Sequence, residues 1–174
     1  MRKLSLATIL ASGLLLSGCS VAPLNFAPAS VPTTSERLNA ALVSTNVTVA
    51  SKDEAVGKLN TAGAEADVAS LWKSTLDDAL IRMALFQDDA PRKLSLVVKI
   101  LELDLRSLGS NARTTAEYEL IDRNTGESVF TTQITTDGAA SDYVGVNRAR
   151  KSANRSVQAN IEQFLEKISS ASFD

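Results

Sequence analysis

The sequence predicts an α+β fold in which a four-stranded, mostly antiparallel sheet carries two helices on one face, in the order β-α-β-β-β-α. Two long segments repeat apolar residues every three or four positions, which is typical of amphipathic helices, and several shorter segments alternate apolar and polar residues, as strands do. Such a sheet with both helices on one face buries the two helix stripes and one sheet face together.

The first strand is predicted at residues 44–51, STNVTVAS, and the connection GKLNTAGAEA (57–66) leads to a helix over about residues 66–87. Asp67 offers an N-cap for this helix. We expect the helix to end before Pro91, because the residue preceding a proline disfavours helical angles. Its apolar stripe comprises Val68, Leu71, Trp72, Leu76, Ala79, Leu80 and Met83.

The next strand is predicted at residues 93–108, where the apolar residues change parity between Ile100 and Leu101. A strand alternates faces at every residue, so this change predicts a β-bulge or bend at that point. A strand that is buried on both faces, or that passes from one apolar environment to another, is the alternative. The two parities are Leu94, Leu96, Val98 and Ile100, and then Leu101, Leu103 and Leu105.

Two further strands form a predicted hairpin. The segments 112–122 and 128–137 alternate in polarity, and between them DRNTGE contains Asn124 and Gly126, both able to take positive φ. The last segment, 141–169, predicts a long amphipathic helix whose first half carries only small apolar residues and must therefore approach its partner closely. Its stripe is Val146, Ala149, Ala153, Val157, Ile161, Phe164, Leu165 and Ile168.

The N-terminus has the pattern of an export signal: Arg2 and Lys3 precede an apolar run, Leu4–Leu16, that is shorter than the roughly 20 residues of a spanning helix. The letters LSGC at its end resemble the lipobox of bacterial lipoproteins. The resemblance implies that residues 1–18 are a cleaved signal peptide and that Cys19 becomes the lipidated first residue. An ordinary secretory signal with an incidental cysteine, or an apolar N-terminal helix, is the alternative.

Several acyl chains on Cys19 would hold the protein firmly on its membrane, whereas one chain holds only marginally. Ser20 stands where such lipoproteins usually place the aspartate that retains them at the inner membrane, so the resemblance favours the periplasmic face of the outer membrane. Residues 19–40 are predicted to be the lipidated N-terminus and a flexible, proline-rich tether, reaching on the order of 3 Å per residue. The alternative is that part of this segment packs along the domain as a strand. Residues 41–174 are predicted to form a single periplasmic domain.

Composition narrows the possible chemistry. The 174 residues contain no histidine and one cysteine, so imidazole bases and Cys/His metal sites are not expected, and we expect no cofactor. Without the two leader cations, 16 basic residues face 20 acidic ones, a net charge of about −4. Nucleic acid is therefore not expected as a partner.

No arrangement of residues predicts catalysis. The pairs Asp77-Asp78 and Asp88-Asp89 are adjacent in sequence and do not face one another on a helix. Ser70 and Lys73 have the spacing S-x-x-K but lack companion motifs, and we expect them to flank the buried stripe in solvent.

One cluster suggests binding. Arg148, Arg150, Lys151 and Arg155 crowd the start of the last helix, where the helix dipole favours negative charge. We interpret them as a patch for an anionic partner, either lipid A phosphates, phospholipid headgroups or an acidic protein surface. The alternative is that they pair with Asp142 and with the strand residues Glu117 and Glu119.

The stretch NARTTAEYELIDRNTGESVFTTQITT (111–136), with the lipobox and the Ala/Arg-rich last helix, resembles small outer-membrane lipoproteins. They include the lipoprotein partner of the lipopolysaccharide-transport pore and the auxiliary lipoproteins of ABC-type lipid transport. The proline-rich segment after Cys19 departs from the first group, and no functional residue carries over individually. The resemblance implies a non-catalytic accessory or assembly subunit of an envelope transport complex, with a membrane anchor and an envelope protein partner. A periplasmic lipid- or glycan-binding module, with its ligand between sheet and helices, is the alternative function.

Overall fold

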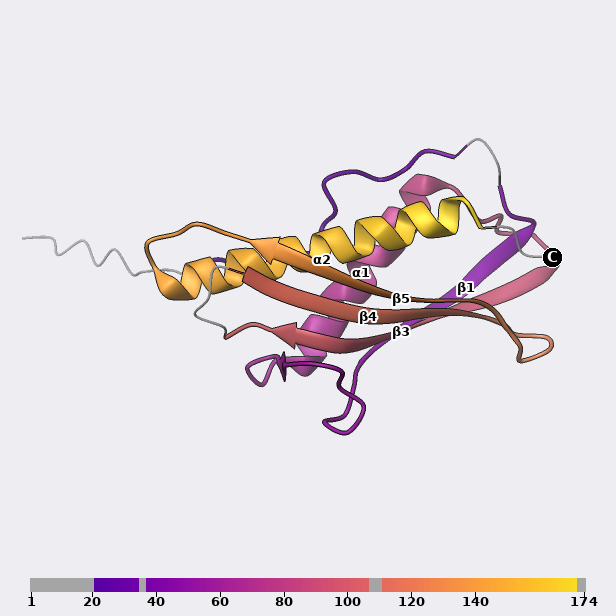
Figure 1. Cartoon of the computed structure of the whole chain (residues 1–174). Coiled ribbons are helices and arrows are strands. Elements are labelled where there is room, and N and C mark those ends of the chain that lie inside the picture. Colours follow the sequence, from indigo (N-terminus) through magenta and orange to yellow (C-terminus); the bar gives the residue numbers. More distant parts are fainter. Residues whose placement is uncertain (1–20, 35–36, 107–110, 172–174) are drawn as a thin grey trace, which may run out of the picture.

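The computed structural model describes residues 21–34, 37–106 and 111–171 (Figure 1). Its elements are β1 (Ala40–Val49), β2 (Leu59–Asn60), α1 (Glu65–Met83), β3 (Arg92–Asp104), β4 (Asn111–Asp122), β5 (Ser128–Ala139) and α2 (Gly145–Ser169). The predicted α+β class and order are confirmed, with the addition of β2. This strand was missed because two residues are too few to show an alternation.

The strands form one sheet in the order β1-β3-β4-β5, and β2 pairs with β3 beyond the end of β1. The pairs β3–β4 and β4–β5 are antiparallel, whereas β1 runs parallel to β3 and is joined to it through α1. Strand β1 begins four residues earlier than we predicted. A register shift between Leu42 and Ser44 places Val43 in an irregularity, which breaks the alternation that the prediction followed.

The bulge predicted in β3 is confirmed. Pairing with β4 shifts between Ile100 and Glu102, so Leu101 is the extra residue. Leu103 and Leu105 then return to the hydrophobic core that Ile100 also joins. Leu101 is buried as well. The bulge thus lets the apolar residues on both sides of it share one core.

The hairpin prediction is also confirmed, since β4 and β5 pair along their length around a turn at 122–127. Gly126 takes a φ of 76°, and its amide donates to the Asp122 carbonyl over 2.7 Å. Asn124 does not take positive φ, and its amide donates to the Asp122 carboxylate over 2.9 Å.

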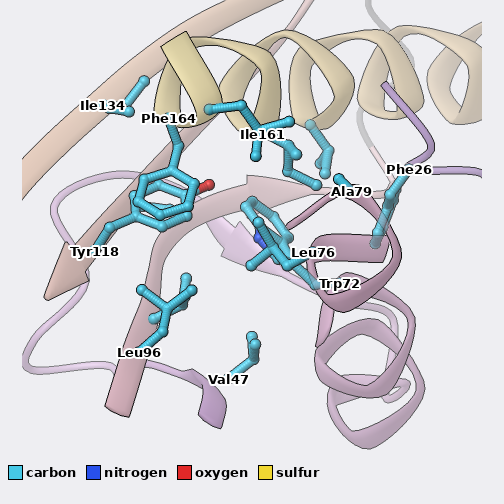
Figure 2. Packing of buried hydrophobic residues seen from close by; sticks show 14 of the residues in the cluster. Phe26, Val47, Trp72, Leu76, Ala79, Leu96, Tyr118, Ile134, Ile161 and Phe164 are labelled. Carbon is cyan, nitrogen blue, oxygen red and sulfur yellow. The ribbon is translucent and has the colours of Figure 1, made fainter. Parts of the chain in front are cut away.

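Both helices contribute to one hydrophobic core on one face of the sheet (Figure 2). The rings of Tyr118 on β4 and Phe164 on α2 stack with centroids 4.2 Å apart. Trp72 on α1 is fully buried in the same core. The opposite sheet face is polar, and its exposed side chains include Ser44, Asn46, Thr48, Thr131, Gln133 and Thr135.

The helix ends differ from the predicted ones. Helix α1 stops at Met83 rather than near residue 87, because Ala84 adopts the left-handed conformation that terminates helices. Asp67 lies in the first turn of α1 and is not its cap, which is Ala64. Helix α2 begins at Gly145 rather than 141, and Val146 of its predicted stripe is about half exposed.

The first half of α2 lies against the sheet as closely as its small residues predicted. A Cβ atom added to Gly138 on β5 would lie 2.2 Å from the backbone oxygen of Ser152 and 2.4 Å from the nitrogen of Ser156. Only glycine at position 138 leaves room for the helix backbone. The contact sets the distance between α2 and the edge of the sheet.

The segment 21–34, which we predicted to be a flexible tether, instead packs along α2, and that prediction is wrong for these residues. The backbone amides of Ala22, Asn25 and Ala29 donate to α2 side chains over 2.6 to 3.2 Å. The α2 residues that bond this segment are Asn147, Asn154, Gln158 and Glu162. The alternative, that part of this segment packs along the domain as a strand, is correct for the packing but not for the strand.

Phe26 anchors the middle of this segment. Its side chain is 0% exposed and meets the ring of Trp72 edge-on, with centroids 5.8 Å apart (Figure 2). Leu24 and Val31 pack against the same core. The N-terminal segment is therefore part of the folded domain, and the domain begins earlier than residue 41.

Candidate functional site

The basic patch predicted from sequence lies where β5 meets α2. Arg148, Lys151 and Arg155 follow a helical spacing of three and four and share one side of α2. Arg150 is two positions from Arg148, and such positions do not share a helix face. The structure therefore brings three of the four predicted cations together and places Arg150 elsewhere.

The three cations bond the end of β5 and the loop that leads from it into the helix. Arg148 donates to the Asp142 carbonyl over 3.0 Å, and Lys151 forms an ion pair with the Asp142 carboxylate over 2.6 Å. Arg155 donates to the carbonyl of Ala139. The pKa of Asp142 is lowered by its hydrogen bond from Lys151, and then by the amide of Val144. The alternative interpretation, in which the cations pair with acidic residues of the protein itself, is therefore correct for Asp142.

Glu117 and Glu119, the other acidic residues of that interpretation, do not lie near the patch. Glu117 and Glu119 alternate along β4 with Tyr118 and Leu120, which are buried against the helices. Neighbouring residues of a strand point to opposite faces. Both glutamates therefore lie on the sheet face that α2 does not cover.

Exposed apolar side chains lie at the same junction, in the loop before α2 and in its first turn. Tyr143 is fully exposed, and Val144 and Val146 are 47% and 49% exposed. An open groove of about 710 Å³ is lined here by Ala140, Ser141, Asp142, Tyr143 and Arg148. The sequence analysis missed this exposure because the helical period assigned Val146 to the buried stripe.

The start of the described N-terminal segment, at residues 21–22, also lies at the β5–α2 junction. The Ala22 amide donates to Oδ1 of Asn147 in the first turn of α2 over 3.0 Å, and the preceding Val21 is about half exposed. Cys19, the predicted lipidation site, lies outside the described residues, as does the predicted signal peptide 1–18. Three residues of extended chain span at most about 11 Å, so covalent geometry keeps Cys19 within that distance of Ala22.

A second groove lies between β1 and α1, at the other end of the domain. It has a volume of about 690 Å³. Its apolar lining includes Leu42, Val43, Leu80, Ile81 and Phe86, and its charged lining Arg37, Lys73, Asp77 and Asp88. Val43 and Ile81 are exposed in this groove, so a molecule that binds here would bury apolar surface.

The other candidate residues are placed as solvent-exposed groups. Ser70 and Lys73 are exposed on α1, and Lys73 pairs with Asp77 over 2.5 Å. Asp88 and Asp89 lie in the exposed turn after α1. Within residues 21–34, 37–106 and 111–171, no cluster of three acidic or thiol ligands could hold a metal ion, and no helix is long and apolar enough to cross a membrane.

No family model matches the chain, and no curated protein matches it by sequence. Its fold is similar to that of a Xanthomonas campestris protein of the family DUF330, with 13% identity, a TM-score of 0.46, and coverage of 84% of this chain and 99% of that one. A Chlamydia trachomatis protein is similar at 9% identity and a TM-score of 0.47, over 74% and 95% of the two chains.

A minor lipoprotein from Acinetobacter baumannii is similar at 11% identity and a TM-score of 0.37, over 72% of this chain and 91% of that one. All three of these proteins are bacterial, and one of them is described as a lipoprotein. Likenesses at these identities and TM-scores carry no inference about activity or partner.

Proposed function

We propose that this protein is a non-catalytic, membrane-anchored lipoprotein that serves as an accessory or assembly subunit of a cell-envelope transport complex for lipid or lipopolysaccharide. Acyl groups on Cys19 would hold it at the periplasmic face of the outer membrane. The observation that carries the proposal is the packing of residues 21–34 along α2. This packing extends the folded domain to within three residues of Cys19, the predicted lipidation site.

The energetics of the anchor support firm attachment. Each buried methylene of an acyl chain contributes about 0.8 kcal/mol, so two or more chains hold a protein on its membrane where one chain holds it marginally. Acyl groups on Cys19 would supply this attachment.

The β1–α1 groove supports the accessory role, because it offers a place for an envelope protein. Strand β1 is an edge strand of the sheet, and edge strands are common sites for pairing with another chain. Ile81 is 76% exposed and Val43 49% exposed beside that edge. A partner that covers them would remove apolar surface from water.

Two measurements test the proposal. Mass spectrometry of the mature protein from cell membranes should find an acylated N-terminal Cys19, and Cys19→Ala should release the protein from the membrane fraction. Affinity capture of the lipidated protein should recover an envelope transport component. An unacylated protein in the soluble fraction would refute the anchor.

A matched pair of variants tests the groove. We expect Val43→Lys with Ile81→Glu to lose the captured protein, because the two charges would be buried by the partner. Thr131→Lys with Gln133→Glu, on the exposed face of β5, is the control and should retain it. Equal capture by both double variants would exclude the β1–α1 groove as the partner site.

The groove also favours the second candidate, a periplasmic lipid- or glycan-binding module. Its volume of about 690 Å³ falls in the range of ligand pockets, and it combines apolar with charged residues. Native mass spectrometry of the protein purified from membranes would detect a bound lipid or glycan. A mass equal to that of the acylated chain alone would count against this function.

A further inference from the structure

We propose that the end of the domain at the β5–α2 junction rests in the headgroup layer of the membrane that holds Cys19. This membrane-facing end consists of Val21, Tyr143, Val144 and Val146, with Arg148, Lys151 and Arg155 behind them. The proposal rests on the anchor of the proposed function and adds an orientation: the domain stands on its membrane by a defined surface.

The first support is the distribution of exposed apolar side chains. Seven large hydrophobic side chains are exposed in the described part of the chain, and four of them are at this end: Val21, Tyr143, Val144 and Val146. Residues 143, 144 and 146 are near neighbours in sequence, and the hydrogen bond from Ala22 to Asn147 brings Val21 to the same turn. A cluster of this kind marks a surface that is covered in the working state.

The second support is the distance to the anchor. Ala22 is bonded to the first turn of α2, and Cys19 lies within about 11 Å of Ala22 because only three residues separate them. The proposed attachment point is therefore separated by only a short length of chain from the first turn of α2, which Tyr143 and Val144 immediately precede. A domain held on so short a connection cannot stand tens of ångströms above the bilayer, as a flexible tether would allow.

The third support is the chemistry of the side chains. Tyrosine is enriched at the level of lipid headgroups, where its ring is partly in apolar surroundings and its hydroxyl reaches water. Arginine and lysine next to an apolar patch are attracted to anionic headgroups. The first turn of α2 has no acidic residue, and the loop before it contributes one, Asp142, which is paired with Lys151. One acidic residue against three cations leaves this end with a net positive charge.

The sheet topology places the β1–α1 groove at the opposite end. Gly138 near the end of β5 touches α2 at Ser152, whereas the start of β1 bonds the segment after α1 through the Gln87 amide and the Ala40 carbonyl. Ala40 pairs with the start of β3, and the start of β3 pairs with the end of β4 at the hairpin turn. Figure 1 shows the β5–α2 junction at one end of the sheet and the start of β1 at the other. With the β5–α2 end on the membrane, the groove beside the start of β1 would lie on the side away from the membrane, open to a partner in the periplasm.

The lone cysteine makes a direct test possible, since acylation of Cys19 leaves any introduced cysteine as the only thiol. In the full-length, lipidated protein, Val144→Cys and, as a control, Ile81→Cys are each labelled with an environment-sensitive fluorophore. Both proteins are placed in vesicles of phosphatidylethanolamine and phosphatidylglycerol. Quenching by nitroxide-labelled lipid and by aqueous iodide is then measured, and Tyr143→Cys provides a second position on the membrane-facing end.

We expect the labels at 143 and 144 to be quenched several-fold more strongly by the lipid nitroxide than the label at 81, and less by iodide. Equal weak lipid quenching at all three positions would overturn the proposed orientation while leaving the anchor intact. Shielding of positions 143 and 144 from both quenchers would mean that a protein covers this end, which also overturns it. Failure of the anchor itself is a separate result, since the protein would then not remain with the vesicles.

Discussion

The hydroxyl of Tyr118 on β4 donates a hydrogen bond of 2.8 Å to Oδ1 of Asn160 on α2, and both side chains are fully buried. The amide nitrogen of Asn160 donates in turn to the carbonyl of Ile134 on β5 over 2.9 Å. Thr114 and Ser156 join their hydroxyls over 2.7 Å nearby. A buried polar network therefore fixes the position of α2 along the sheet, because a shift would leave its members unpaired.

Replacing Tyr118 with phenylalanine should lower the free energy of unfolding by about 1–3 kcal/mol, because Oδ1 of Asn160 would stay buried without its donor. Asn160→Ala should cost more, since it leaves both the Tyr118 hydroxyl and the Ile134 carbonyl without that partner. Urea unfolding of the two single variants and the double variant measures the coupling, and the double variant should lose less than the sum. Tyr143→Phe, at an exposed tyrosine, is the control and should stay within about 0.5 kcal/mol of the wild type.

Phe26→Ala should destabilise the protein by about 3–5 kcal/mol, the usual cost of truncating a buried phenylalanine. It should also release residues 21–34 from α2, because the fully buried Phe26 ring anchors this segment against Trp72. Chemical denaturation measures the first effect, and the rate of proteolytic cleavage within the segment measures the second. Thr33→Ala, at an exposed position, serves as the control. Rapid cleavage of the wild-type segment under native conditions would contradict its docking.

Gly138→Ala should destabilise the protein by about 1–3 kcal/mol, because the new methyl group would overlap the α2 backbone at Ser152 and Ser156. Gly57→Ala is the comparison, since the atoms nearest to its Cβ would be those of the Glu102 carboxylate, the end of a side chain that can turn away at the cost of its hydrogen bond from Thr115, and it should destabilise less. Thermal unfolding of both variants would show the difference. Equal melting temperatures would mean that α2 does not approach the sheet at Gly138.

The pKa of Glu54 should lie far below that of an ordinary glutamate. A hydrogen bond from Lys99, with further bonds from Ser51, lowers the pKa of Glu54 from 4.5 to about 2. Because the folded-state pKa is depressed, the contribution of this group to stability is present above pH 4.5 and is lost as the pH falls toward 2. Carbon-detected NMR titration should show this pKa, and Lys99→Met should raise it toward 4.5. A wild-type pKa near 4.5 would show that the pair is open in solution.

Much of the fold follows from local patterns. The parity change at Ile100 and Leu101 predicted the β3 bulge, because a strand has two faces and an apolar residue is stable on only one of them. The small residues in the first half of α2 predicted its close approach to a partner, which Gly138 completes. Helix ends were less predictable, since Ala84 takes a left-handed conformation that alanine seldom adopts.

The candidate sites were less accessible to sequence reasoning. The spacing of the four cations identified the start of α2 as a charged region, and in a helix the same spacing already separates Arg150 from the other three. The bonds of those three to Asp142 and Ala139 depend on where β5 ends. The exposure of Tyr143 and Val144 had no signal in the periodicity. It depends on where β5 ends and where α2 begins.

By itself, the sequence determined the α+β class, the hairpin, the bulge and the two amphipathic helices, because each depends on near neighbours along the chain. Its lipobox-like N-terminus also predicted the anchor at Cys19. Only the tertiary structure decided that residues 21–34 belong to the domain. Their contacts reach α2 residues more than 120 positions away, and a segment without helix or strand has no period to reveal what it packs against.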